Sequence, residues 1–384
     1  MAEAVIVEAV RSPVGKRNGG LSGVHSGELS AQVLNGLVER AGVDPAIVDD
    51  VIWGCVIQAG EQALDIARTA VLAAGWPESV PGVTVDRQCG SSQQSVHFAA
   101  AGVVAGHYDV VVAGGVESMS RTPMGASLAN GGHPYPEAFR SRYSQTPNQG
   151  IGAEMIAEQW GLSRIALDEF SLGSHEKAAA AQESGAFDDQ IVAIRATDEA
   201  RDSIVLKDEG IRRGGTLESI GKIKPAFKED GVIHAGNSSQ ISDGAAALLF
   251  MSAEKAKSLG VKPLAKVHTA VLAGADPVIM LTAPIPATQK ALRRAGLSIE
   301  EIGVFEVNEA FAPVPLAWLN DIGADEKALN PNGGAIALGH PLGASGARIM
   351  TTMLYHMRDK GIQYGLQTMC EGGGQANATI LELL

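Results

Sequence analysis

The sequence predicts an α/β protein made of two similar halves with a segment inserted between them. Short apolar strands alternate with amphipathic helices at the start of the chain, and the same order returns in its last third. Ala41-Gly42 before one strand recurs as Ala295-Gly296 before another, at an offset of 254 residues that several elements share. We therefore expect a first half at 1–117 with 241–263, an inserted loop domain at 118–240 and a second half at 264–384.

The first half shows both helical and strand periodicity. Apolar residues recur with helical spacing over 33–41, while Asp109–Ala113 carries an unbroken valine run, as in a sheet covered on both faces. In chain order the expected elements are a strand at Val5–Ala9, a helix over 33–41, a strand at Val51–Cys55, a helix at Ile66–Ala74, a strand over 83–85, a helix over 96–104 and a strand at Asp109–Ala113.

The second half repeats this order. A strand is expected at Val304–Val307, then a helix with one apolar face of Met350, Met353, Leu354 and Met357. A strand at Leu366–Met369 follows, which we expect to be the last of the chain. The inserted segment is rich in Gly, Pro, Ser, Asn and charge, with helices expected at Ala153–Trp160 and Leu167–Ser184. An insertion between two such halves often covers the site that they form.

Composition narrows the class of protein. The charged fraction of 19% is below the roughly 25% of an average soluble protein, so part of the surface is expected to be buried in a homo-oligomer, a dimer or a dimer of dimers. The net charge of −13 argues against nucleic acid as a partner. No apolar run reaches about 18 residues, so no membrane insertion is expected. Three cysteines, far apart and without a signal peptide, predict neither disulfides nor a zinc site and favour the cytoplasm.

Two cysteines and one histidine lie on turns of small residues. His340 sits in the Gly-rich stretch Asn330–Arg348, where no amphipathic helix face can be drawn around it. Cys89 follows a strand and opens a helix, where free N–H groups and the helix dipole favour a thiolate, although a buried cysteine is equally compatible with a small core side chain. Cys370 ends a strand before three glycines whose N–H groups could bind an oxyanion. Cys55, within an apolar strand, is expected to be a core residue.

Two further segments carry polar or basic residues at positions where they could contact a ligand. Asn308 and Glu309 end the first apolar strand of the second half, where side chains of α/β sheets face the ligand crevice; a helix cap is the alternative for Asn308. The inserted segment holds a basic run suited to phosphates, or equally to a solvated face, made of Arg212, Arg213, Lys222, Lys224 and Lys228.

Together these segments resemble the thiolase family, the acyl-coenzyme A acetyltransferases. The resemblance runs from RSPVGKRNGGLSG at Arg11–Gly23 to the C-terminal CEGGG, and its most specific motifs are GNSSQISDGAAA, NEAFA and NPNGGAIALGHPLGASGAR. It implies the thiolase fold, in which two duplicated βαβαβ halves are layered α/β/α/β/α. It also implies thiolytic cleavage of a 3-ketoacyl-CoA through an acyl-cysteine, reversible as a Claisen condensation, with CoA as co-substrate and no permanently bound cofactor or metal.

The resemblance also implies a role for each site residue. Cys89 corresponds to the acylated nucleophile, His340 to the histidine that activates it and Cys370 to the general acid/base. Asn308 corresponds to the residue whose ordered water forms one oxyanion hole with His340, and the N–H groups of Cys89 and Gly372 form the second. We expect the two cysteines to approach each other closely and to face His340. The residues that fall where the family contacts CoA are Arg212, Phe227, Ala235 and Ser239.

Some positions depart from the usual family pattern. Asp86 stands where the family usually has Asn, Ser92 and Ala376 replace glycines, and Pro147-Asn148-Gln149 stands near the place of a His-Met pair in short-chain biosynthetic members. The last change looks like actinobacterial thiolases that degrade steroids and other bulky acyl groups, so Asn148 and Gln149 are expected to contact substrate.

Other functions are considered beside a degradative thiolase. A biosynthetic acetoacetyl-CoA thiolase and a catalytically impaired thiolase-like protein are the alternatives. Ketosynthases use Cys-His-His and chalcone-type synthases Cys-His-Asn, so Cys370 argues against both. A Cys-His hydrolase is disfavoured because no water-activating carboxylate accompanies the pair in a recognisable motif.

Overall fold

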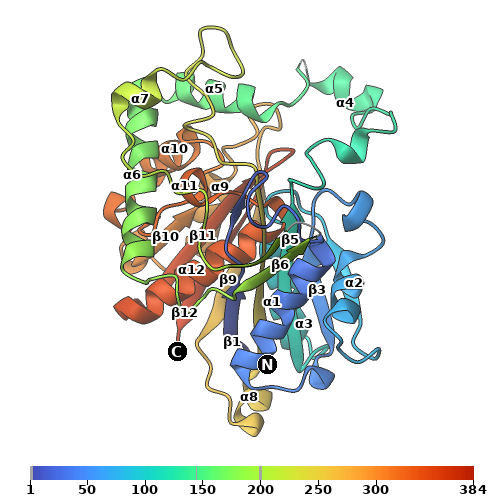
Figure 1. Cartoon of the computed structure of the whole chain (residues 1–384). Helices are drawn as coiled ribbons and strands as arrows, with labels where there is room; N and C mark the ends of the chain where they lie inside the picture. The colour runs from blue at the N-terminus through green and yellow to red at the C-terminus, as the bar shows by residue number, and fades with distance from the viewer. Residues whose placement is uncertain (1–2, 144, 199–200) are drawn as a thin grey trace.

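The computed structural model describes residues 3–143, 145–198 and 201–384, and both halves contain the alternating elements expected from the sequence (Figure 1). The first half consists of β1 (Ala4–Arg11), β2 (Gly15–Lys16), α1 (Ser26–Ala41), β3 (Asp50–Gly54), α2 (Ile66–Ala73), β4 (Gly82–Val85), α3 (Ser91–Val104), β5 (Val110–Ser118), β8 (Ser242–Ser252) and α8 (Ala253–Leu259). The second consists of β9 (Ala265–Gly274), α9 (Pro284–Ala295), β10 (Val304–Val307), α10 (Pro313–Ile322), α11 (Ala335–Leu338), α12 (Ser345–Lys360), β11 (Tyr364–Glu371) and β12 (Gln375–Leu383).

One expectation about the C-terminus is wrong. The strand that contains Cys370 is not the last of the chain, because β12 follows it and pairs antiparallel with β11 along its length. Gly373 and Gly374 turn the chain between them with φ angles of 85° and 75°, in the left-handed region that glycine adopts without strain. The CEGGG motif is therefore a hairpin corner.

The offset of 254 residues holds in three dimensions. Strand β5 begins at 110 and β11 at 364, α3 begins at 91 and α12 at 345, and α1 and α9 end at 41 and 295. Helices α1 and α9 each end at a glycine with a left-handed backbone conformation, Gly42 (φ 66°) and Gly296 (φ 70°). The two halves are thus copies of one α/β unit.

The strands lie in the order β10-β11-β12-β9-β1-β8-β5-β3-β4, with β2 added on β8. In the first half β4, β3 and β5 run parallel, and in the second half β10 and β11 run parallel. An antiparallel strand follows β5 and β11 in the sheet. Only two residue pairs, Val5↔Lys266 and Ile6↔Ala265, join the halves through β1 and β9. This narrow junction lets the two halves of the sheet turn toward each other.

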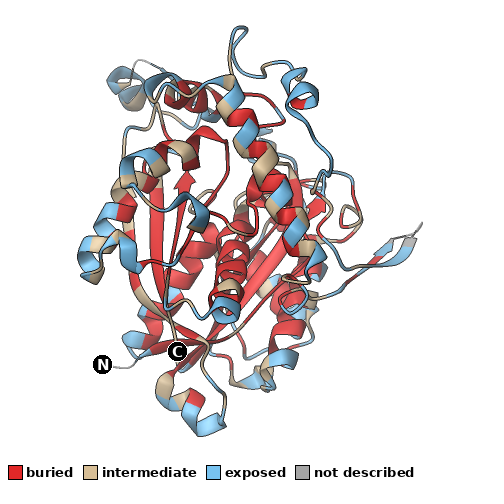
Figure 2. Cartoon of the chain, turned by 90° about the vertical axis from the view of Figure 1, so that its left-hand side faces the viewer, coloured by how far each residue is buried: buried red, intermediate tan, exposed pale blue. Residues whose placement is uncertain are grey.

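Alternate side chains on the strands enter different layers. Val110 and Val112 pack with α1 and α2 on the outer side, whereas Val111 and Ala113 face α3 and α12. The apolar face of α12 is buried in this central layer, and the outer face of the second half packs on α9 and α10 around Trp318. The strands are accordingly buried, while the outer helices carry exposed faces (Figure 2). This is the α/β/α/β/α layering that the resemblance implied.

The inserted segment lies over one end of the layered unit (Figure 1). It contains α4 (Glu137–Arg142), α5 (Gln149–Gln159), α6 (Arg164–Glu183), the hairpin β6 (Ile194–Asp198) and β7 (Arg201–Val205), and α7 (Leu217–Gly221). Helix α5 packs on α10 and α6 packs on α11, so the segment rests mainly on the second half. No helix in the described part of the chain combines the length and apolarity that a membrane span requires.

Candidate active site

Cys89 lies in the turn between β4 and α3. The preceding residue, Gln88, has a φ of 47°, an uncommon backbone conformation for a residue with a side chain. The side chain of Cys89 is buried in a small cluster with Ile349 and Met369, against which Leu342 packs. Burial raises the pKa of the thiol to about 12, and Glu371 adds to the rise, whereas the N–H groups of Cys89 and Gly372 lower it. These two N–H groups therefore favour negative charge on the sulfur.

His340 follows Gly339, whose φ of 105° and contact with Ser242 leave no room for a side chain. Ser345 Oγ donates to the carbonyl of Pro341 (2.8 Å) and so accepts from His340 Nδ1 (2.6 Å). This bond places the proton on Nδ1 and leaves the lone pair on Nε2. Burial, with the charge of Arg348, lowers the pKa of His340 to about 3. The imidazole is therefore neutral at physiological pH and its Nε2 can accept a proton.

Asn308 lies directly after β10, beside the histidine. Its Nδ2 is 3.4 Å from His340 Nε2, and its N–H donates to the carbonyl of Thr368 on β11 (3.1 Å). The Oδ1 atom is buried and has no hydrogen-bond partner among the described residues. An unpaired buried acceptor of this kind is costly unless water or a ligand supplies a donor.

Cys370 lies near the end of β11 and is fully buried. Burial raises the pKa of its thiol well above the ordinary value, and the neighbouring Cys89 raises it further. The two sulfurs therefore lie within electrostatic reach of each other. Cys55, which the sequence predicted as a core residue, packs in the first-half core, and burial and Glu117 raise its pKa.

Two buried carboxylates hold the turns of the site in place. Glu309 accepts from Ser174 Oγ (2.6 Å), Asn330 Nδ2 (2.9 Å) and the N–H of Ile336 (3.1 Å), so it ties α6 to the loop before His340. Glu309, the neighbour of Asn308 in the NEAFA motif, is thus structural. Sequence analysis missed the second, Glu117, and also missed Ser345, whose place five residues after the histidine was the available signal.

Four N–H groups and the Cys55 thiol donate to Glu117. It accepts from the N–H groups of Val56 (2.9 Å), Ile57 (3.1 Å) and Gly343 (2.8 Å) and from Gln62 Nε2 (2.7 Å). The bond to Gly343 crosses from the first half to the turn after His340. Glu117 therefore joins the halves at the base of the site.

The residues predicted to contact CoA lie on the inserted segment and beside it. Arg212 lines a cavity of about 120 Å³ with Leu172, His175 and Ile220. Phe227 is 40% exposed and meets Phe311 of the NEAFA motif edge-on, at 5.8 Å between ring centroids. The N–H of Ser239 donates to the carbonyl of Ala310 (2.9 Å), and Ala235 is exposed. Phe227 and Ser239 thus both contact the segment that follows β10.

The other predicted contacts are more peripheral. Asn148 and Gln149 are exposed at the start of α5, where Asn148 Oδ1 accepts from the N–H of Ile151 (3.1 Å) as a helix cap. In the basic run, Arg213 pairs with Glu183 (3.2 Å) and Lys222 with Glu218 (2.7 Å). Pairing leaves these two cations less available for phosphates than the sequence suggested.

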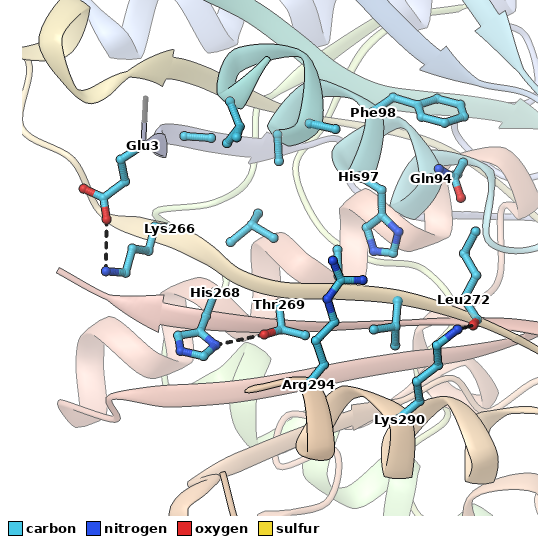
Figure 3. Close-up of a pocket in the computed structure, with 17 residues that line it drawn as sticks. Glu3, Gln94, His97, Phe98, Lys266, His268, Thr269, Leu272, Lys290 and Arg294 are labelled. Carbon is cyan, nitrogen blue, oxygen red and sulfur yellow. Dashed lines mark hydrogen bonds and ion pairs between the residues drawn. The ribbon is translucent and has the colours of Figure 1, made fainter. Parts of the chain in front are cut away.

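A groove larger than the cavity beside Arg212 lies elsewhere (Figure 3). It has a volume of about 820 Å³ and runs between the outer face of α3, with His97 and Phe98, and β9 with Lys266. Glu3 pairs with Lys266 at 3.0 Å across one end. None of the predicted site residues lines this groove.

Comparison with known proteins identifies the family of this chain. The model of the thiolase N-terminal domain matches residues 4–254, and that of the thiolase C-terminal domain matches residues 261–383. The chain belongs to the thiolase family. It is therefore an acyltransferase, and both the resemblance and the fold class predicted from sequence are confirmed.

Relatives of this thiolase match it from end to end. Steroid 3-ketoacyl-CoA thiolase FadA6 of Mycobacterium tuberculosis is 50% identical, over 100% of this chain and 95% of the relative. A 3-ketoacyl-CoA thiolase of Saccharophagus degradans is 47% identical, over 99% of this chain and 98% of the relative. The crystal structure of the Bacillus anthracis acetyl-CoA acetyltransferase has a TM-score of 0.93 and 40% identity, covering 100% of this chain and 99% of that one.

Proposed function

We propose that this thiolase cleaves 3-ketoacyl-CoA with CoA to give acetyl-CoA or propionyl-CoA and a shortened acyl-CoA. The observation that carries the proposal is a pair of buried cysteines within electrostatic reach of each other, one of which, Cys89, has its negative charge favoured by two backbone N–H groups. A neutral histidine with its lone pair on Nε2 completes the set. The relatives include 3-ketoacyl-CoA thiolases, which supports a degradative role.

In the first half-reaction Cys89 attacks the keto carbon of the substrate. His340 Nε2 accepts the thiol proton, and the thiolate forms a bond to C3 while the C2–C3 bond breaks. The negative charge of the departing thioester enolate develops on its oxygen. His340 and a water held by Asn308 donate to that oxygen, and Cys370 protonates C2. The unpaired Oδ1 of Asn308 supports this role because it needs a donor such as water.

In the second half-reaction CoA removes the acyl group from Cys89. Cys370 takes the proton of the incoming thiol, whose sulfur attacks the acyl carbonyl. The N–H groups of Cys89 and Gly372 stabilise the tetrahedral oxyanion. The Cys89 thiolate then leaves, and the shortened acyl-CoA is released. In the reverse direction the same steps perform a Claisen condensation.

The inserted loop domain is proposed to hold CoA and the acyl tail. The cavity beside Arg212 is lined by this cation and by apolar side chains such as Leu172 and Ile220, which suits the adenine and phosphate of CoA. Phe227 and Ser239 then follow the pantetheine arm toward Phe311. Identity of 50% with a steroid thiolase, together with Asn148 and Gln149 at the start of α5, favours a bulky acyl group.

We propose that the active form is a homo-oligomer whose copies meet over the edge strand β4 and the groove of Figure 3. Unpaired strand edges and exposed apolar side chains on one face are typical of interfaces. This face is marked by the half-exposed residues Leu72, Val83, Phe98 and Val104. The reaction needs free thiols at Cys89 and Cys370, which fits work in the reducing cytoplasm.

The test is a CoA-dependent cleavage assay over short, long, branched and steroid-derived 3-ketoacyl-CoA substrates, with intact-mass analysis of the enzyme. We expect turnover that is highest on the bulky substrates and an acyl adduct on Cys89 when CoA is withheld. The variant C89A should give neither product nor adduct. An acyl adduct that still forms on C89A, or the absence of turnover on every substrate, would overturn the proposal. A strong preference for acetoacetyl-CoA would instead favour the biosynthetic alternative.

A further inference from the structure

Glu371 follows the second cysteine directly and has no role in the steps above. It lies at the end of β11. The offset of 254 residues between the two halves relates it to Glu117, near the end of β5. Both carboxylates are buried. The duplicated fold therefore contains this glutamate twice, once in each half.

The two copies have different surroundings. Glu117 accepts from four N–H groups and a thiol, whereas Glu371 accepts one hydrogen bond within the described chain, to Oε1 from the N–H of Asn377 (3.1 Å). Glu371 Oε2 is buried and has no partner among the described residues. Burial raises the pKa of Glu371 to about 8, and the nearby Arg87 opposes the rise. An uncharged carboxyl group fits this environment better than a carboxylate does.

Glu371 lies against the turn that carries the nucleophile. A Cβ atom built on Gly90 would be 2.0 Å from Glu371 Oε1 and 2.8 Å from Asn377 Oδ1. Asn377 Nδ2 also donates to the carbonyl of Gly90 (3.2 Å). Gly90 is the N-cap of α3 and has no side chain to cap the helix. The hairpin corner of β11 and β12 thus supports the first turn of the nucleophile's helix.

Asn377 Oδ1, like Glu371 Oε2, is a buried acceptor without a partner in the described residues. Asn377 contacts both Glu371, through its N–H, and Gly90, through its Nδ2, while one acceptor atom of each of the two side chains lacks a donor. A proton on the carboxyl group of Glu371 supplies a donor, because a neutral carboxyl group both donates and accepts. Removal of that proton leaves Glu371 Oε2 without a partner and adds a negative charge near Cys89.

We propose that Glu371 is a positioning residue for Cys89: uncharged, its carboxyl group supports the Gly90 turn, and charged, it opposes formation of the thiolate. The inference deepens the proposed function, on which its relevance to catalysis rests. The groups that face Glu371 are Arg87 and Cys89 from the segment before α3, and Cys370 on its own strand. Strand β12 contributes the amides of Gln375 and Asn377.

The experiment measures how fast iodoacetamide alkylates Cys89, a reaction that needs no acyl-CoA and no turnover. The rate is followed by peptide mass spectrometry between about pH 6 and pH 9, on either side of the Glu371 value of about 8. We expect E371Q, which cannot ionise, to match the wild type at the acid end. At the alkaline end it should react about three- to tenfold faster, because each unit of thiol pKa changes the thiolate fraction tenfold.

Glu306 provides a matched control. It is a buried glutamate on the neighbouring strand β10, its pKa is also raised by burial to about 8, and it is not among the groups that shift Cys89. E306Q should keep the wild-type ratio of alkaline to acid rates. Equal profiles for E371Q and the wild type, or the same change in E306Q, would overturn the inference.

The wild-type protein offers a second readout if E371Q does not fold. Its alkylation rate should rise less than tenfold per pH unit around pH 8, because Glu371 loses its proton there. A rate that follows a single ionisation throughout would contradict the inference. Failure of the thiolysis assay would leave these alkylation profiles unchanged, so the two proposals fail separately.

Discussion

The turn around Cys89 in the first half and the turn around Gly343 in the second occupy equivalent places in the duplicated fold, yet the same position holds the nucleophile in the first and a closely packed glycine in the second. Gly343 is packed against the ends of β3 and β5: a Cβ there would be 2.5 Å from Val116 O and 2.7 Å from Gly54 O. Every site residue has such a counterpart 254 residues away, and the pairs are Cys89 with Gly343, His340 with Asp86, Asn308 with Gly54 and Cys370 with Val116.

This difference explains why two copies of one unit form a single site. In the first half, the space equivalent to the site is closed by direct backbone contact, since a Cβ on Gly54 would lie 2.5 Å from Ser92 N. In the second half the equivalent residues are Asn308 and Cys370, whose polar atoms are buried without full pairing. One side of the pseudo-symmetric pair thus serves packing, which leaves the other free for chemistry.

The largest expected effect compares His340 with its counterpart Asp86. Loss of a general base costs about 10²- to 10⁴-fold, so H340A should lower kcat/KM by about a thousandfold. Asp86 is exposed and mainly accepts from the N–H of Gln88 (2.7 Å). D86N, which restores the residue usual in the family, should change kcat/KM by less than about threefold. Steady-state kinetics on a substrate that the wild type turns over measure both, and equal losses would break the comparison.

Much of this asymmetry was available in the sequence. The offset of 254 residues, the four site residues and the order of helices and strands follow from periodicity, small-residue turns and the family motifs. Strand β12 was missed because both of its faces are buried, so Asn377 and Thr379 inside it do not alternate with exposed positions. The hydrogen-bond partners of Glu117 and Glu371 could not be predicted, because they depend on which turns the fold brings to each carboxyl group.

The second expected effect concerns Gly343 itself. G343A adds one methyl group where three backbone atoms, Val116 O, Cys55 Cα and Gly54 O, lie closer than 3.0 Å to the new Cβ. Backbone cannot move aside as a flexible side chain can, so we expect a loss of about 3 kcal/mol of stability. Chemical denaturation of G343A beside C89A should show this loss only in G343A. Comparable stability of both variants would mean that close backbone packing around Gly343 does not fill this space.

The smallest expected effect distinguishes Glu117 from Glu371 by the pH dependence of stability. The folded-state pKa of Glu371, about 8, lies above its unfolded value near 4.5. Between these values the native state holds a proton that the unfolded chain has released, so stability falls as pH rises, by at most about 1.4 kcal/mol per pH unit for this group. E371Q should flatten the decline between about pH 5 and pH 8. E117Q instead replaces one of the two carboxylate oxygens, each of which accepts from two N–H groups, with an NH₂ donor and should lower stability by about 2 kcal/mol across the range. Melting temperatures at several pH values measure both variants, and a decline in E371Q as steep as in the wild type would show that Glu371 is already ionised in the folded protein.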